Sequence, residues 1–137
     1  MHASYLERLA TANLALIDAD IAAHADDPSA ATRAIFAAIA ADVARPTFRG
    51  CAFNNASIEF DDPEHPARVV ARHYRAALHE RLAGLGEVIA PGRGEELGSH
   101  LALIVDGMYV NAAHLGRDGP AAAGPALAAA LVEAARD

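Results

Sequence analysis

Residues 45–70, RPTFRGCAFNNASIEFDDPEHPARVV, interrupt a sequence that is otherwise rich in alanine and typical of helices. The stretch holds a glycine, the only cysteine of the chain, two adjacent asparagines and a run of carboxylates and prolines. Because Pro63 and Pro66 cannot both lie inside one helix, we expect DDPEHP to be a loop. Residues 48–60 are expected to form a short helix or helical turn before that loop.

The sequence on both sides of this stretch predicts longer helices. Apolar residues at helical spacing place them over about residues 4–25, 28–45, 66–82, 92–116 and 120–136. Asp27 is expected to cap the second helix, with Pro28 at its first position. The helix that begins at 66 is expected to end at the Gly84 and Gly86 pair. Since alanine is the strongest helix former, and no repeat or linker divides the chain, the sequence predicts one all-α domain over 1–137, a five- to six-helix bundle.

Composition and charge exclude several classes of protein. The formal net charge is −7, from 18 acidic and 11 basic residues in 137, and a chain this acidic is poorly suited to neutralising nucleic-acid phosphates. A single cysteine cannot form an internal disulfide and fits a reducing compartment. No apolar run is long enough to span a membrane, and no signal-peptide pattern opens the sequence. We therefore expect a cytoplasmic domain with no nucleic-acid or membrane partner of its own.

The helix expected over 92–116 is apolar on more than one side. Leu97, Leu101 and Ile104 form one stripe, whereas Leu103 and Val110 lie on nearly the opposite side. A helix with two apolar faces is buried on both. A chain of this size does not cover both sides from within, so we expect a second copy of the chain to cover the outer one.

Signals for catalysis are weak. The run EFDDPEH concentrates carboxylates and His65 in seven residues, which permits a metal site, but in a proline-broken loop such side chains serve as caps for the next helix. Cys51 is interpreted as a buried thiol that packs as a small apolar group. GRG at 92–94 lacks the remaining residues of a phosphate-binding loop and is expected to be a turn. We expect no catalysis, cofactor or metal, with a small metal-dependent enzyme as a less favoured alternative.

Several polar residues interrupt apolar helix faces. They are Asn13, Asn54 or Asn55, His73, Tyr74, His100 and Asn111. One interpretation is that they hydrogen-bond one another inside a core. The other is a mostly apolar pocket with a few orienting polar groups, which describes small-molecule sites.

Two segments resemble a known family. FRGCAFNNASIEFDDPEHPARVVARHYRAALHERL is similar to the central part of the C-terminal regulatory domain of TetR/AcrR-type repressors, where R-G-C-x-F-x-N-A-x-x-E-F precedes a D-x-x-H-P loop and a long helix. LGSHLALIVDGMYVNAAHLG resembles that family's penultimate helix, whose apolar run ends in D-G, here Asp106–Gly107. The family's N-terminal helix-turn-helix domain has no counterpart in these residues, so we expect this chain not to bind an operator.

The resemblance implies a homodimer that forms through the last two helices and a pocket for a small, mostly apolar effector. Gly50 would let the backbone turn, with Phe53 and Ile58 tucked into the core beside the pocket. The expected dimer residues are Leu103, Gly107, Val110, Leu127 and Leu131. The expected pocket residues are Leu9, Asn13, Ile17, Phe53, Asn54, His73, Tyr74, His100, Ile104 and Met108. The alternative without a pocket is a bare helical dimerisation module.

Overall fold

The computed structural model describes residues 2–137, and every regular element in them is helical. The elements are α1 (His2–Ala23), α2 (Pro28–Val43), α3 (Ala52–Glu59), α4 (Pro66–Ile89), α5 (Gly94–Leu115), the short 3₁₀ helix η1 (Pro120–Ala123) and α6 (Gly124–Arg136). The predicted all-α architecture of five to six helices is confirmed. None of these helices combines the length and apolar character that crossing a membrane requires.

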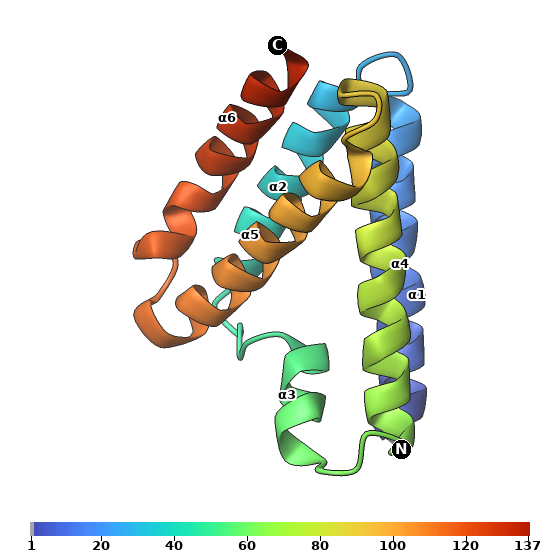
Figure 1. The fold of residues 1–137 in the computed structure, drawn as a ribbon. Helices are drawn as coiled ribbons and strands as arrows, with labels where there is room; N and C mark the ends of the chain where they lie inside the picture. The colour runs from blue at the N-terminus through green and yellow to red at the C-terminus, as the bar shows by residue number, and fades with distance from the viewer. Residues whose placement is uncertain (1) are drawn as a thin grey trace.

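Helices α1 and α4 lie side by side and form one edge of the molecule (Figure 1). Helix α5 crosses from the upper end of α4 over α2. At the other edge, α6 packs against α2 and α5. The short α3 lies below the crossing of α2 and α5 and packs on α4. In this arrangement, α1, α2, α4 and α5 face one another around the middle of the molecule.

The start of α2 follows its sequence signals. The Asp27 carboxylate accepts a hydrogen bond from the backbone N–H of Ala30 at 3.0 Å, and Pro28 occupies the first turn. One N–H that would otherwise lack a partner is thereby satisfied. The helix ends at Val43, three residues before Pro46. The predicted N-cap is confirmed.

The core has two parts that meet at Tyr74. The larger part lies between α2, α4, α5 and α6, where Phe36, Leu82 and Leu101 are fully buried. The smaller part joins α1, α3 and α4 around Phe53, whose ring stacks on Tyr74 with centroids 4.0 Å apart. Tyr74 packs against both parts. The space between the two parts is where the candidate site lies.

The expected end of α4 at Gly84 and Gly86 is wrong, because the helix continues to Ile89. Gly86 instead allows α5 to approach: a Cβ built there would lie 2.9 Å from the carbonyl oxygen of Gly94. The turn follows at Gly92, which has φ +85°. Gly86 therefore serves a close helix crossing rather than a C-cap.

The 45–70 stretch confirms two local expectations and corrects two. Gly50 has φ +92°, a conformation that favours glycine, and α3 begins just after it. Phe53 is buried as expected, but Ile58 is 80% exposed, because the single short helix packs only one side on α4. The cap of α4 is also not a carboxylate. His65 is the N-cap, and its Nδ1 accepts a hydrogen bond from the backbone N–H of Ala67 at 3.1 Å.

Candidate functional site

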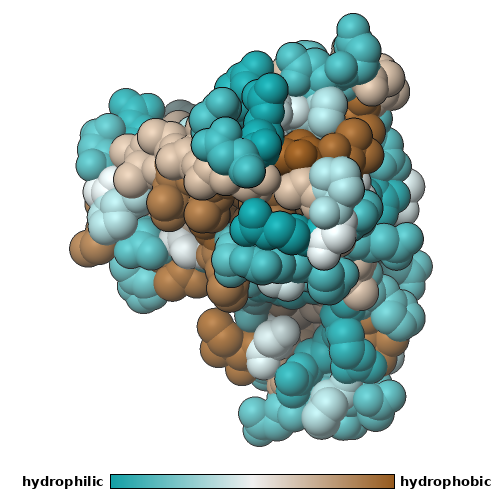
Figure 2. Space-filling view, turned by 45° about the horizontal axis from the view of Figure 1, so that its top comes forward, coloured by the Kyte–Doolittle hydropathy of each residue, from teal (hydrophilic) through white to brown (hydrophobic). Residues whose placement is uncertain are grey.

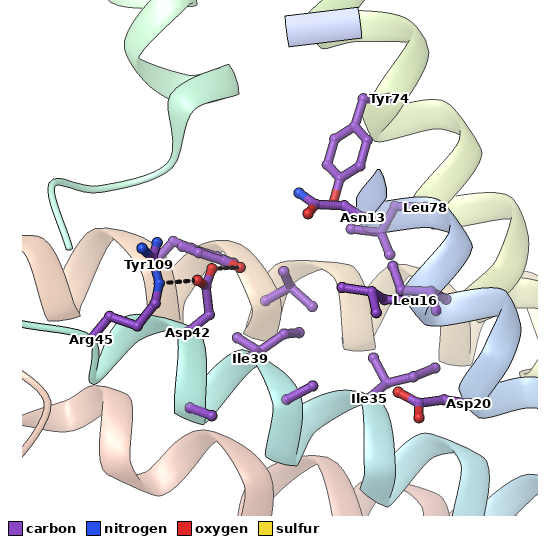
Figure 3. A pocket seen from close by; sticks show the side chains of 14 residues that line it. Asn13, Leu16, Asp20, Ile35, Ile39, Asp42, Arg45, Tyr74, Leu78 and Tyr109 are labelled. Carbon is purple, nitrogen blue, oxygen red and sulfur yellow. Dashed lines mark hydrogen bonds and ion pairs between the residues drawn. The ribbon is translucent and has the colours of Figure 1, made fainter. Parts of the chain in front are cut away.

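A cavity of about 380 Å³ opens between α1, α2, α4 and α5 (Figure 3). Most of its wall is apolar: Leu16, Ile17, Ile35, Ala38, Ile39, Ala41, Leu78 and Val105. Leu16 is 67% exposed, and Ala38 and Ala41 are exposed as well, so these residues form the mouth between α1 and α2. A wall of this composition and size is typical of small-molecule sites.

Polar groups at one end of the cavity come from α2 and α5. The Tyr109 hydroxyl donates to Asp42 Oδ2 at 2.7 Å, and Arg45 Nε donates to Asp42 Oδ1 at 2.7 Å (Figure 3). Burial, and then the bond to the Asp42 carboxylate, raises the pKa of Tyr109 well above its usual range. The phenol therefore stays a neutral donor at physiological pH.

A second polar pair lies on the opposite wall. Tyr74 from α4 and Asn13 from α1 point toward each other (Figure 3). Burial raises the pKa of Tyr74, and the neighbouring Asn13 amide opposes part of that rise. An apolar body in the cavity would thus have a hydrogen-bonding group at either end.

A second cavity, of about 520 Å³, adjoins the first toward α3. Seven residues line both cavities: Asn13, Asp42, Arg45, Tyr74, Leu78, Val105 and Tyr109. We call the two cavities together the central compartment. The part toward α3 is more polar, because its remaining wall includes Thr47, Arg49, Asn55, Arg75 and Asp106.

Arg75 ties three helices together at the wall of this polar part. Its guanidinium donates to Asp106 of α5 and to Asn54 of α3. The planar fork of arginine suits two acceptors at once. The contact holds α3 beside the compartment, where the helix otherwise packs on α4.

Half of the predicted pocket residues line the central compartment. These are Leu9, Asn13, Ile17, Phe53 and Tyr74. They come from α1, α3 and α4, as expected for helices whose faces converge.

The other five lie elsewhere. Asn54 accepts from Arg75 rather than lining the cavity. His73 lies on the outer groove between α1 and α4, and His100 is exposed on α5. Ile104 and Met108 belong to the larger core, where Met108 packs at Gly124 of α6. Each of these residues is on the expected helix but on a different side of it.

Three residues that shape the compartment were not predicted: Asp42, Arg45 and Tyr109. Asp42 and Arg45 are three apart near the end of α2, a spacing that indicates a local ion pair. Tyr109, however, meets Asp42 across 67 positions of sequence, and no local pattern shows that contact.

Among residues 2–137, no group of three or more His, Cys, Asp or Glu side chains is placed to hold a metal ion. In the carboxylate-rich loop, Asp62 accepts the N–H of Glu64 at 2.9 Å, and Glu64 lies 3.5 Å from Arg72. Cys51 is a half-buried free thiol whose pKa is raised by burial, the direction that makes a thiol less reactive.

Comparison with known proteins places the fold. The crystal structure of a TetR-family transcriptional regulator from Streptomyces coelicolor superimposes with a TM-score of 0.91 over 98% of this chain and 70% of that chain, at 22% sequence identity. The fold is TetR-like. No protein-family profile matches the sequence. No curated protein sequence matches it either.

In this TetR-like fold, four of the five predicted dimer residues lie on the outer side of α5 and α6. Leu103 is 70% exposed, Val110 49% and Leu127 52%. A Cβ at Gly107 would meet open space. Leu131 is partly buried against the core. Four of the five residues therefore leave an apolar or small surface facing outward.

Proposed function

We propose that this chain is the effector-binding and dimerisation domain of a TetR-like transcriptional regulator. The central compartment carries the proposal, because its apolar wall and paired polar groups suit a small, mostly apolar molecule. In the intact regulator, the bound molecule would control binding to DNA. The chain itself, with a net charge of −7, would not contact the operator.

The first helix is the proposed link between effector and DNA. Asn13, Leu16 and Ile17 of α1 line the compartment, so a ligand between α1 and α2 changes the packing of α1 directly. Such coupling requires that the ligand bind with different affinity to two conformations of the protein that differ in the position of α1. A small tilt of α1 would respace the DNA-reading parts of a dimer, whose half-sites lie about 34–36 Å apart.

The proposed dimer would cover the apolar outer side of α5 and α6. Hydrophobic patches are visible on the part of the surface that these helices form (Figure 2). Leu103 and Leu127 are large side chains left in solvent by the single chain. A stable contact of two such faces should bury more than about 1,000 Å².

A thermal-shift screen of apolar and aromatic metabolites tests the proposal. A ligand at a hundredfold over its dissociation constant should add about 2.7 kcal/mol to the free energy of unfolding. Tyr74→Phe should lower the affinity of the tightest-binding compounds, because it removes the hydroxyl that faces the compartment. The ring would stay stacked on Phe53.

Two results would replace the proposal. If no compound class stabilises the protein, it is a dimerisation module without a ligand. If protein purified without chelator holds stoichiometric zinc, iron or manganese, a metal-dependent enzyme takes its place.

A further inference from the structure

The charges that line the central compartment are unevenly compensated. Asp42 pairs with Arg45, and Asp106 pairs with Arg75. After these pairs, the wall retains one further arginine and one further carboxylate, Arg49 and Asp20.

Arg49 lies in the polar part of the compartment, just before the turn at Gly50. Its Nη1 donates to the Phe48 carbonyl oxygen at 3.1 Å, and among residues 2–137 no carboxylate lies within ion-pair distance of it. The polar part therefore carries a positive charge that the described protein does not neutralise.

Asp20 lies in the apolar part, on α1 beside the mouth formed by Leu16. Among the described residues no arginine or histidine pairs with its carboxylate, since His24 bonds only to its backbone oxygen. The compartment is thus positive toward α3 and negative toward the C-terminal end of α1. A ligand with one charged end would be oriented by this difference.

From this arrangement we propose that the ligand is an amphipathic carboxylic acid, with its apolar body between α1 and α2 and its carboxylate toward Arg49. This inference rests on the proposed function and names the chemical class of the effector. Asp20 disfavours the reverse orientation, because like charges repel. Two more guanidinium groups line the polar part. Arg75 is bonded to Asp106 and Asn54, whereas Arg45 has its Nε bonded to Asp42 and its Nη atoms without a partner among the described residues.

Because Arg49 is exposed, water also solvates the ion pair, and the expected gain is modest. This gain in affinity is measured by comparing a carboxylate with an alcohol that has the same apolar body. The pairs are hexanoate and hexanol, octanoate and octanol, decanoate and decanol, and naphthoate and naphthylmethanol, and decylamine is the cationic compound. We expect the best carboxylate to bind about fivefold tighter than its alcohol at low salt, and the preference to shrink as salt is added.

Arg49→Gln should remove this preference and leave the affinity of the alcohol unchanged. Arg117→Gln is the matched control, because Arg117 is an exposed arginine outside the compartment. Carboxylates and alcohols that bind equally, a preference for decylamine, or a preference that survives Arg49→Gln would each overturn the inference and leave the proposed apolar site standing. Failure of every compound to bind would overturn both.

Discussion

The Tyr109 hydroxyl donates a 2.7 Å hydrogen bond to Asp42 Oδ2, and this bond joins the C-terminal half of α5 to the last turn of α2 at one end of the central compartment. One side of α5 thus forms the wall of the proposed ligand site. Its other side carries Leu103 and Val110, which we assign to the dimer contact. Helix α5 would therefore connect the proposed ligand site with the second subunit of the proposed dimer.

Removing this hydroxyl should cost stability. Tyr109→Phe is expected to lower the free energy of unfolding by about 1 kcal/mol, since one partly buried hydrogen bond is lost while Asp42 keeps Arg45. Urea denaturation at neutral pH measures the change. Tyr5→Phe is the control, because Tyr5 is 53% exposed. Equal losses in the two variants would contradict the role assigned to the bond.

Stability should also fall at alkaline pH. The pKa of Tyr109 is raised in the folded protein, so its contribution is complete below the unfolded value of about 10 and is lost as the pH rises through the folded value. Tyr74 shifts in the same direction and adds to the effect. Urea midpoints measured from neutral pH to about pH 11 should fall less steeply in Tyr109→Phe than in the wild type. Parallel curves would rule out Tyr109 as the source.

Two glycines of the α4–α5 region should respond oppositely to alanine. A Cβ on Gly98 would lie 2.6 Å from the Cα of Ala83, so Gly98→Ala should destabilise the fold by about 1–3 kcal/mol. Gly84 lies inside α4 with nothing within 4 Å, so Gly84→Ala should stabilise by up to about 1 kcal/mol. Thermal unfolding of both variants checks the crossing. A tolerated Gly98→Ala would show that the helices are farther apart than described.

The dimer prediction is tested on the exposed face of α5. Leu103→Glu should convert the dimer to a monomer, because two carboxylates would be brought into an apolar contact. Ile58→Glu places the same charge on a side chain that is 80% exposed on α3, and it should leave the dimer intact. Sedimentation at micromolar concentration distinguishes the two. A wild type that is itself monomeric would end the dimer proposal.

Local signals in the sequence predicted most of the fold. The Asp27 cap, the turn at Gly50 and the turn at Gly92 each depend on one residue and its neighbours, and the structure confirms all three. The end of α4 was wrong, because Gly86 acts through its distance to Gly94 of another helix. A C-cap and a close helix crossing both select glycine, and the sequence does not distinguish them.

The candidate site was less predictable, because it too depends on contacts between different helices. Tyr74 and Asn13 stand out as polar residues on apolar helix faces, and both line the compartment. Met108, an apolar residue, was also predicted to line the pocket, but it packs at Gly124 of α6. Which side of α5 faces α6 and which faces the cavity depends on contacts far apart in the chain, such as Tyr109 with Asp42.

The central claim, that a small apolar molecule binds between α1 and α2, is tested most directly by filling the space. Ala38 is exposed at the mouth and lines the cavity, whereas its neighbour Ala37 is exposed outside it. Titration calorimetry of the tightest compound from the screen would compare Ala38→Trp with Ala37→Trp. We predict that Ala38→Trp lowers the affinity by at least about tenfold, which corresponds to about 1.4 kcal/mol, and that Ala37→Trp matches the wild type. Equal affinity in all three proteins would contradict the account.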